Sequence, residues 1–281
     1  MRRVLLSLVL AVAALLPAVP APAMVSPELV PVSVQYAKSW RSAQSGLTDA
    51  ARRVAALQAQ AEPADLLGVL RHDLQLEVAQ YVYRDSIRSQ QVIVYALAVD
   101  QGLEDQVAGL LPAAELRPLR QTTEALRALW RAAGISDLGQ IQIRYNRRLE
   151  DSAPVAQLAG YYRTSGGRYA IDWSYLAAIN FIESDFGRVN GPSSAGALGP
   201  MQFMPGTWEA YGGGGDIMSP RDSIEAAARY LHAMGGPGNM DRAIYRYNND
   251  SDYVASVKGF AAALRADPSW LDRLYFWSTS G

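Results

Sequence analysis

The sequence predicts an all-α fold, and three observations support this class. Apolar residues recur at spacings of three and four through most of the chain, which is the period of a helix with one buried face. The alternation of apolar and polar residues typical of half-buried strands is absent, apart from the ambiguous segment 91–99. The chain has no cysteine, so packing rather than disulfide bonds must hold the helices together.

Residues 1–23 depart from this pattern because they have the layout of a signal peptide. Arg2 and Arg3 precede an apolar run over 4–16, and residues 21–23 (Ala-Pro-Ala) have the small-residue spacing of a cleavage site. The run is too short for the roughly 20 residues that a membrane-spanning helix needs. We expect cleavage after Ala23, export to the periplasm, cell wall or medium, and no stable membrane span afterwards. An uncleaved anchor is the alternative.

Residues 24–150 are expected to form a helical N-terminal region of unknown role. Segments 47–60 and 66–85 show helical spacing, and 119–134 does so with Thr122 as a possible N-cap and Gly134 at its end. The region has no compact cluster of Asp, Glu, His or Gly that indicates chemistry. A spacer, a scaffold and a docking surface are the roles that remain open. Whether the protein has protein partners is not readable from the sequence.

The second predicted domain covers residues 151–281, after a polar seam that ends near Pro154. A Gly-broken turn, with Asp172 as the N-cap of the next helix, and a Gly-rich loop over 187–200 interrupt the helical pattern. The helix over 173–186 is apolar nearly all round, which in a soluble protein indicates burial in the core. The helices are expected at 155–164, 173–186, 205–211, 222–234, 240–250 and 251–266.

Several kinds of chemistry are disfavoured by the composition. A net charge of −1 argues against nucleic acid as a partner. Without cysteine there is no thiolate nucleophile and no Cys-ligated metal, and the two histidines, His72 and His232, lack partners at ligand spacing. No Gly-x-Ser-x-Gly turn and no phosphate-binding glycine loop is present. We expect no metal and no cofactor, so catalysis would depend on carboxylates.

Glu183 is the carboxylate in the most unusual position. On a helix it shares a face with Leu176 and Ile179, whereas Asp185 points elsewhere and is expected to meet water. Burial and the negative end of the helix dipole both disfavour the charged carboxylate, so both raise the pKa of Glu183. A carboxyl that keeps its proton near neutral pH can act as a general acid. A structural glutamate that binds the following loop is an equally good reading of the helix position alone.

The loop that follows Glu183 favours a sugar-binding cleft. Glycines at 191, 196 and 199 permit turns and close approach, and Gln202 has an amide suited to hydroxyl and N-acetyl groups. Apolar side chains able to lie against sugar rings follow at Met204, Trp208, Tyr211, Tyr245 and Tyr247. For any one of these aromatic residues, packing between helices is the more common role.

Three motifs in order resemble those of the soluble lytic transglycosylases, which are relatives of goose-type lysozyme that cleave peptidoglycan. These motifs are "ES" at 183–184, "GALGPMQFMPGTW" at 196–208 and "YRYNNDSDYV" at 245–254. The segment 219–236 also resembles the family's helix between the second and third motifs. The resemblance covers about residues 155–260 and implies a lysozyme-like helical catalytic domain. It does not extend to the N-terminal half.

The resemblance also implies roles for individual residues. Glu183 would be the catalytic acid and base. Tyr247 and Asn248 match the pair that braces the catalytic Glu and the N-acetyl group, and the positions that contact the sugar beside the scissile bond are Ser193, Gln202 and Met204. Pro200, and the absence of Gly after Asn248, are more similar to the membrane-bound B-type branch.

The reaction implied is a lyase reaction on peptidoglycan glycan strands, with one glutamate as acid and then base and no cofactor. It would cleave the β-1,4 bond between N-acetylmuramic acid and N-acetylglucosamine and give 1,6-anhydromuramoyl products. A lysozyme-like hydrolase that uses water with Asp216 or Asp222 is the first alternative. A catalytically inactive wall-binding protein is the second. Whether cleavage is internal or from chain ends is left open by the sequence.

Overall fold

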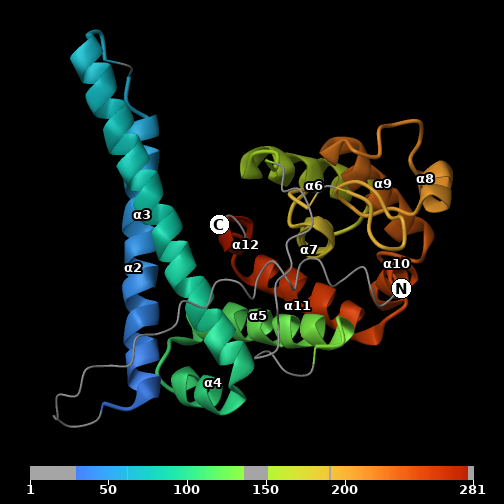
Figure 1. Ribbon diagram of the computed structural model, residues 1–281, viewed down its shortest axis with the longest axis horizontal. Helices are drawn as coiled ribbons and strands as arrows, with labels where there is room; N and C mark the ends of the chain where they lie inside the picture. The colour runs from blue at the N-terminus through green and yellow to red at the C-terminus, as the bar shows by residue number, and fades with distance from the viewer. Residues whose placement is uncertain (1–29, 62, 136–150, 190, 278–281) are drawn as a thin grey trace. The chain divides into compact units, whose positions relative to one another are not determined.

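The computed structural model describes residues 30–61, 63–135, 151–189 and 191–277. These residues form helices joined by turns and loops (Figure 1). Within the described ranges the nearest approach to a strand is an isolated bridge between Leu198 and Phe203. The expected all-α class is confirmed. The predicted signal peptide, residues 1–23, lies outside the described residues and stays a prediction.

The chain divides by packing into two compact units, of which the first, hereafter the hairpin unit, contains the described residues up to Pro112. Its long helices α2 (Val32–Gln58) and α3 (Leu66–Val99) run antiparallel and side by side, and α4 (Gln101–Ala108) packs against both (Figure 1). Asp65 accepts a hydrogen bond from the Gly68 backbone at the start of α3. The ambiguous segment 91–99 is the last part of α3, so it is helical.

The second unit contains the described residues from Ala113 onward. It is called the catalytic unit below because it includes Glu183, for which the resemblance implies a catalytic role. It is built on α7, which lies among α6, α9, α11 and α12 and is almost entirely buried along its length. The helices are α5 (Ala113–Ala132), α6 (Val155–Tyr169), α7 (Trp173–Ser184), α8 (Pro205–Tyr211), α9 (Pro220–Ala233), α10 (Met240–Tyr247), α11 (Ser251–Ala266) and α12 (Trp270–Trp277).

The division between the compact units lies earlier than the sequence suggested. Helix α5 packs along α11 and so belongs to the catalytic unit, although the sequence assigned its residues to the N-terminal region. Gly259 of α11 allows this approach, because a β-carbon there would lie 3.0 Å from the backbone oxygen of Gln121 and closer still to Ala125. The predicted boundary at residue 150 adjoins residues 136–150, which lie outside the described residues. The division into a helical N-terminal region and a catalytic domain at this point stays a prediction.

Local differences from the predicted helices have clear physical reasons. Thr122 is not an N-cap: it lies inside α5, where its hydroxyl donates to the Pro118 carbonyl at 2.8 Å. Helix α6 continues through the two glycines expected to break it and ends at Tyr169, where Ala170 adopts the left-handed conformation. Gly166 instead permits a close approach of the Ile171 carbonyl, with which a β-carbon would collide at 2.4 Å. Asp172 is the N-cap of α7, as predicted, and accepts from the Ser174 backbone at 2.9 Å. Helix α12 was not expected.

None of the described helices is both long enough and apolar enough to cross a membrane. Helix α2 is amphipathic. Ala37, Trp40, Ala43 and Leu47 follow one another at helical spacing on its buried face, and most of its exposed residues are polar or charged.

Candidate functional site

Glu183 is buried at the C-terminal end of α7. Its side chain lies in the core with only 5 % of the residue exposed, and Leu176 and Ile179 of the same helix are fully buried. One carboxylate oxygen accepts a hydrogen bond from the Tyr253 hydroxyl at 2.7 Å. Tyr253 belongs to α11, which packs against α7. Glu183 therefore has the buried position that the sequence predicted.

Burial raises the pKa of Glu183 from 4.5 to about 7. The loss of hydration is the dominant cause, because a buried carboxylate loses favourable contact with water while the neutral acid loses little. The hydrogen bond from Tyr253 acts in the opposite direction and lowers the pKa, since it stabilises the charged form. A large fraction of the Glu183 side chains is thus protonated at neutral pH.

Asp185 does not meet water, contrary to the expectation from the sequence. The residue is 2 % exposed, and its carboxylate forms an ion pair with Arg188 at 3.3 Å. The reason is the backbone: Asp185 is the C-cap of α7 in the left-handed conformation, with φ of 54°. This turns the chain back toward the core. The Arg188 guanidinium also lies 4.2 Å from the centre of the Tyr275 ring.

A hydrogen-bonded latch fixes both ends of the Gly-rich loop, 187–200, to α7. Asn180 and Ser184, both fully buried on α7, each donate a side-chain hydrogen bond to the carbonyl of Pro200, the former at 2.8 Å. The Ser184 hydroxyl also accepts from the Gly187 backbone at 2.8 Å. Tyr162 of α6 donates to the side-chain oxygen of Asn180 at 2.6 Å. Ser184, the second residue of the "ES" motif, thus serves to hold the loop.

Gln202 lies just after the Gly-rich loop, and only one of the two polar groups of its side chain has a hydrogen-bond partner. The residue is 7 % exposed and has a left-handed backbone with φ of 50°. Its amide nitrogen donates to the Gly199 carbonyl at 3.0 Å. Its amide oxygen is buried and has no hydrogen-bond partner among the described residues. Because a buried acceptor without a partner is costly, this oxygen is a plausible contact for a donor on a ligand.

Ser193 and Met204 have different surroundings. Ser193 is buried, and its hydroxyl oxygen accepts from the backbones of Ala195 and Ala197 at 3.2 and 2.9 Å, so it holds a turn of the loop. Met204 precedes α8 and is 45 % exposed. The Ser193 hydroxyl retains a proton to donate, whereas Met204 offers an accessible apolar surface.

Tyr247 is close to Glu183 but does not bind it directly. Its hydroxyl donates to the Met201 carbonyl at 2.7 Å, which ties the end of α10 to the loop. The pKa of Tyr247 is raised well above 10, first by burial and then by the charge of Glu183, which indicates that the two groups are near one another. Asn248 is the buried C-cap of α10.

Tyr253 is the residue that sequence reasoning missed. It donates the hydrogen bond to Glu183 that the resemblance led us to expect from the Tyr247–Asn248 pair. Burial, and then the charge of Glu183, raise its pKa well above 10 as well. The signal was present in the sequence, since Tyr253 is the last tyrosine of the third motif. Its role depends on the packing of α11 on α7, which no local pattern reveals.

The aromatic residues near the loop pack mostly on each other. Phe203 lies edge-to-face on Trp208 with ring centres 5.6 Å apart, and Tyr230 lies edge-to-face on Tyr247 at 5.5 Å and on Tyr211 at 5.0 Å. Packing between helices is thus a major role for Trp208, Tyr211 and Tyr247. Tyr245, in contrast, is 43 % exposed.

The other acids and the histidines have structural contacts. Asp216 accepts from the Met218 backbone at 2.9 Å, and Asp222 accepts from the Asp216 backbone at 3.0 Å, so both stabilise the turn before α9. His72 and His232 each form a hydrogen bond of 2.9 Å with a backbone carbonyl. Among the described residues there is no group of three or more His, Cys, Asp or Glu side chains that could hold a metal ion.

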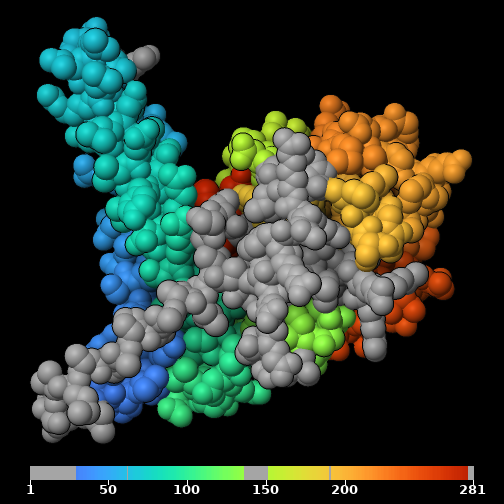
Figure 2. Space-filling view, viewed as in Figure 1, coloured from blue at the N-terminus to red at the C-terminus, as the bar shows by residue number. Residues whose placement is uncertain are grey.

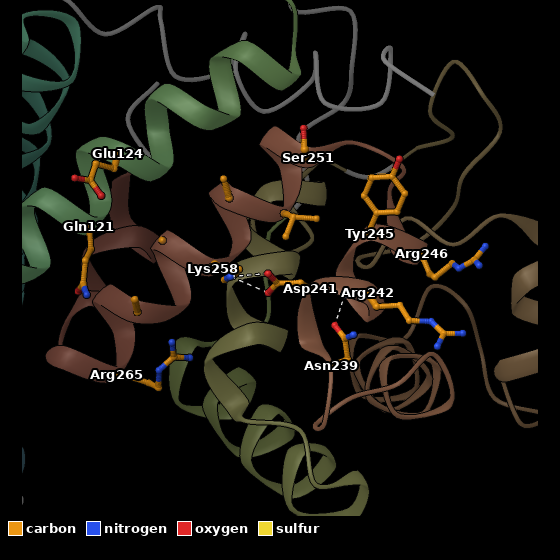
Figure 3. A pocket seen from close by; sticks show the side chains of 14 residues that line it. Gln121, Glu124, Asn239, Asp241, Arg242, Tyr245, Arg246, Ser251, Lys258 and Arg265 are labelled. Carbon is orange, nitrogen blue, oxygen red and sulfur yellow. Dashed lines mark hydrogen bonds and ion pairs between the residues drawn. The ribbon is translucent and has the colours of Figure 1, made fainter.

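A broad hollow of about 1180 Å³ lies elsewhere on the catalytic unit. Side chains of α5, α10 and α11 line it, among them Glu124, Arg246 and Lys258 (Figure 3). Tyr245, one of the candidate sugar-ring contacts, also lines it, but Glu183, Ser193, Gln202, Met204, Tyr247 and Asn248 do not. Lys258 is ion-paired with Asp241 at 2.8 Å across the hollow. The hollow is therefore not the surface on which Glu183 would meet a substrate.

Comparisons with known proteins identify the domain around Glu183. Residues 160–263 match the transglycosylase SLT domain, a range that includes Glu183, the loop and Tyr253. The chain is also 30 % identical over 148 residues to the membrane-bound lytic murein transglycosylase F of Thiobacillus denitrificans. This match covers 50 % of the chain but 30 % of that relative, so the chain spans less than a third of the relative's length.

No solved structure matches the chain significantly. The domain match agrees with the helical, lysozyme-like architecture of the catalytic unit, and its limits fall between the start of α6 and the last turn of α11. Residues 160–263 are therefore similar to the transglycosylase SLT domain, and the chain shares this similarity with a curated lytic murein transglycosylase.

Proposed function

We propose that the protein is a peptidoglycan lytic transglycosylase that cleaves the β-1,4 bond between N-acetylmuramic acid and N-acetylglucosamine and leaves 1,6-anhydromuramoyl ends. The observation that carries the proposal is the state of Glu183: a buried carboxyl with a pKa of about 7, inside an SLT domain. Such a group supplies a proton to a leaving oxygen and takes one back near neutral pH.

Glu183 acts first as the acid. It gives its proton to the glycosidic oxygen, which leaves with the N-acetylglucosamine as the bond to C1 of the muramic acid breaks. The N-acetyl group of the same muramic acid stabilises the positive charge that develops at C1. Tyr253 supports the carboxylate that remains, because its hydrogen bond favours the charged form.

Glu183 then acts as the base. Its carboxylate takes the proton from the 6-hydroxyl of the muramic acid, and the oxygen attacks C1 to close the anhydro ring. Glu183 regains its proton, and no water is consumed. The reacting hydroxyl is already in the same sugar as C1, so the step avoids the entropic cost of bringing in a second molecule.

The surroundings of Asp185 favour a mechanism with a single carboxylate. Most glycosidases place a second carboxylate beside the bond as nucleophile or base. Asp185 is the acid nearest in sequence to Glu183, but it is buried in an ion pair with Arg188. Asp216 and Asp222, the acids considered for a hydrolase, accept backbone hydrogen bonds in a turn. These contacts leave Glu183 as the acid best placed for the chemistry.

The loop and α10 would bind the sugars. The unpaired amide oxygen of Gln202 suits a donor such as an N-acetyl N–H, and the exposed Met204 suits the apolar face of a sugar ring. The Ser193 hydroxyl has a proton to donate, and Tyr247 and Asn248 hold the end of α10 near Glu183. The name of the similar protein from Thiobacillus denitrificans supports murein as the substrate. The signal-peptide pattern of residues 1–23 supports action after export, in the periplasm, the cell wall or the medium.

Product analysis tests the proposal. Purified peptidoglycan is digested with the protein and the fragments are analysed by mass spectrometry. We expect anhydromuramoyl ends, which are lighter by one water than the ends left by hydrolysis. Glu183→Gln is the inactive control, and Asp216→Asn and Asp222→Asn should leave the products unchanged. Reducing ends alone would establish a hydrolase, and no fragments at all would leave wall binding as the function.

A further inference from the structure

The N-terminal half of α3 has an apolar stripe on its outer surface. Seven large apolar side chains there are 43–74 % exposed, and together they define the α3 stripe: Leu66, Leu67, Leu70, Leu74, Val78, Tyr81 and Val82. In Figure 2 this part of α3, coloured cyan, lies at the surface of the hairpin unit. The spacings of three and four place the seven on one side of the helix. Isolated exposed apolar residues are common, but a contiguous row of this size marks a contact surface.

The stripe is a second apolar face, distinct from the one that packs on α2. At the same height along the hairpin, His72 forms a hydrogen bond of 2.9 Å with the Leu57 carbonyl of α2. Ala79 and Ile87 are buried on that inner side. The fold of the hairpin therefore already uses one side of α3 and leaves the other uncovered in the described structure. The outer surface of α2 is polar, with exposed residues such as Lys38, Ser45 and Arg52. Of the two long helices, α3 is therefore the one with a row of exposed apolar side chains.

The stripe is symmetric about Leu74. The other members lie four, seven and eight residues on either side of it, as Leu70 and Val78, Leu67 and Tyr81, and Leu66 and Val82. Two copies of α3 that cross antiparallel at Leu74 would bring each of these residues level with its symmetric counterpart. Leu74 itself would lie at the two-fold axis. A surface that matches itself in this way is what a symmetric dimer requires.

We propose that the α3 stripe binds the α3 stripe of a second copy of this chain, so that two hairpins form an antiparallel four-helix bundle. The proposal does not depend on the function of the catalytic unit. A bundle of this kind buries apolar rows between helices that run nearly antiparallel, as α2 and α3 already do within one copy.

The exposed apolar area is a substantial part of what a dimer interface needs. The seven side chains are 43–74 % exposed, which leaves an apolar row on the order of several hundred Å². A standard protein interface buries about 800 Å² on each partner. The stripe would therefore supply the apolar centre of such an interface, with the polar residues beside it as the rim.

The residues that border the stripe do not suit a membrane surface. Helices that lie on membranes carry many Lys and Arg beside the apolar face. Six exposed charged residues lie within or beside the stripe, four of them acidic and two basic: Asp65, Asp73, Glu77, Asp85, Arg71 and Arg84. Anionic lipid would repel this excess of acids. In the antiparallel pairing, Arg71 of one copy would instead lie level with Glu77 of the other, because each is three residues from Leu74.

Light scattering of the full chain without residues 1–23 tests the proposal first. We expect the mass of two chains for the parent protein. Val78→Arg should raise the dissociation constant of the dimer at least about 30-fold, since it places a charge in the centre of an apolar contact. Val99→Arg is the matched control: Val99 is on the same helix and is 56 % exposed against 54 % for Val78, but it lies outside the stripe. Its mass should remain that of the parent.

A single cysteine tests the register. The chain has no cysteine, so Leu74→Cys introduces the only thiol. An antiparallel crossing at this residue brings two such thiols together at the axis, within reach of a disulfide. Oxidation of Leu74→Cys should give a covalent dimer that a reducing agent converts back to monomers. Val99→Cys should give little covalent dimer under the same conditions.

Three outcomes would overturn the proposal. A parent protein that is monomeric at about 100 μM, well above the dissociation constants of specific dimers, rules out this partner. A dimer that forms equally well with Val78→Arg would show that another surface holds it. Binding of the parent monomer to vesicles of anionic lipid, lost in Val78→Arg but not in Val99→Arg, would assign the stripe to a membrane instead.

Discussion

The end of α7 and the turn that follows it hold two buried acids with different partners. Glu183, on the last turn of the helix, faces the Tyr253 hydroxyl, and burial raises its pKa to about 7. Asp185, in the left-handed turn, is also buried but forms an ion pair with the guanidinium of Arg188. Since both acids are buried, their partners distinguish them: one has a neutral hydrogen-bond donor and the other has a cation.

From this difference we infer a catalytic role for Glu183 and a structural role for Asp185, two residues further along the chain. A group that must gain and lose a proton in each cycle cannot lie beside a permanent opposite charge. A group that must hold a turn in place benefits from one. We therefore expect changes at Glu183 to affect the reaction and changes at the Asp185–Arg188 pair to affect the fold.

The largest expected effect is the loss of activity in Glu183→Gln. The amide has nearly the same shape but has no acidic proton to give, so release of wall fragments should fall by a factor of about 10³ or more. Circular dichroism and the thermal midpoint should show an intact fold. Retention of more than a tenth of the activity would exclude Glu183 as the acid.

The second effect is the loss of stability in Arg188→Met. This change leaves the Asp185 carboxylate buried without its ion-pair partner, so the free energy of unfolding should drop by about 3 kcal/mol. Urea denaturation measures it. In Asp185→Asn/Arg188→Met both charges are absent, and most of the loss should be recovered. If the single variant costs nothing, the pair does not hold the turn. The activity of the molecules that remain folded should be close to that of the parent.

Glu183 also predicts how stability depends on pH. The folded protein keeps the Glu183 proton up to about pH 7, while the unfolded chain releases it near 4.5, so the folded state binds more protons between these values. The free energy of unfolding should therefore fall as the pH rises from 4.5 to 7, by about 3 kcal/mol from this group, and stay low above pH 7. Relative to the parent, Glu183→Gln should gain stability over that range and show no such gain below pH 4.5. Urea unfolding at pH 4 and pH 8 compares the two proteins.

The smallest effect is expected from Tyr253→Phe. Removal of the hydroxyl takes away the hydrogen bond that lowers the pKa of Glu183, so this pKa should rise above its value of about 7. The fall of activity on the alkaline side should move to higher pH, and the maximum rate should drop about tenfold. A lower rate with an unchanged pH profile would mean that Tyr253 only fills space.

Much of the site was readable from the sequence because its signals are local. Helical spacing placed Glu183 on the buried side of α7, and the glycines predicted the loop that the latch from Asn180 and Ser184 holds. Asp172 as an N-cap and the helix at Pro205–Tyr211 also follow from residues adjacent in the chain. These features depend on residues within a turn or two of one another.

The parts that could not be read depend on distant contacts. The burial of Asp185 requires a left-handed C-cap and an arginine that is itself held over Tyr275, some ninety positions away in the chain. The role of Tyr253 requires α11 to lie against α7. The place of α5 in the catalytic unit requires Gly259 to let two helices approach closely. Residue periodicity describes one helix at a time and does not report which helix packs on it.

The latch on Pro200 has a consequence for which substitutions the loop tolerates. The hydrogen bonds from Asn180 and Ser184 end on the carbonyl oxygen of Pro200, a group that every amino acid possesses. A substitution at position 200 should therefore keep these hydrogen bonds. Asn180→Ala or Ser184→Ala, in contrast, removes a donor and should loosen the loop from α7.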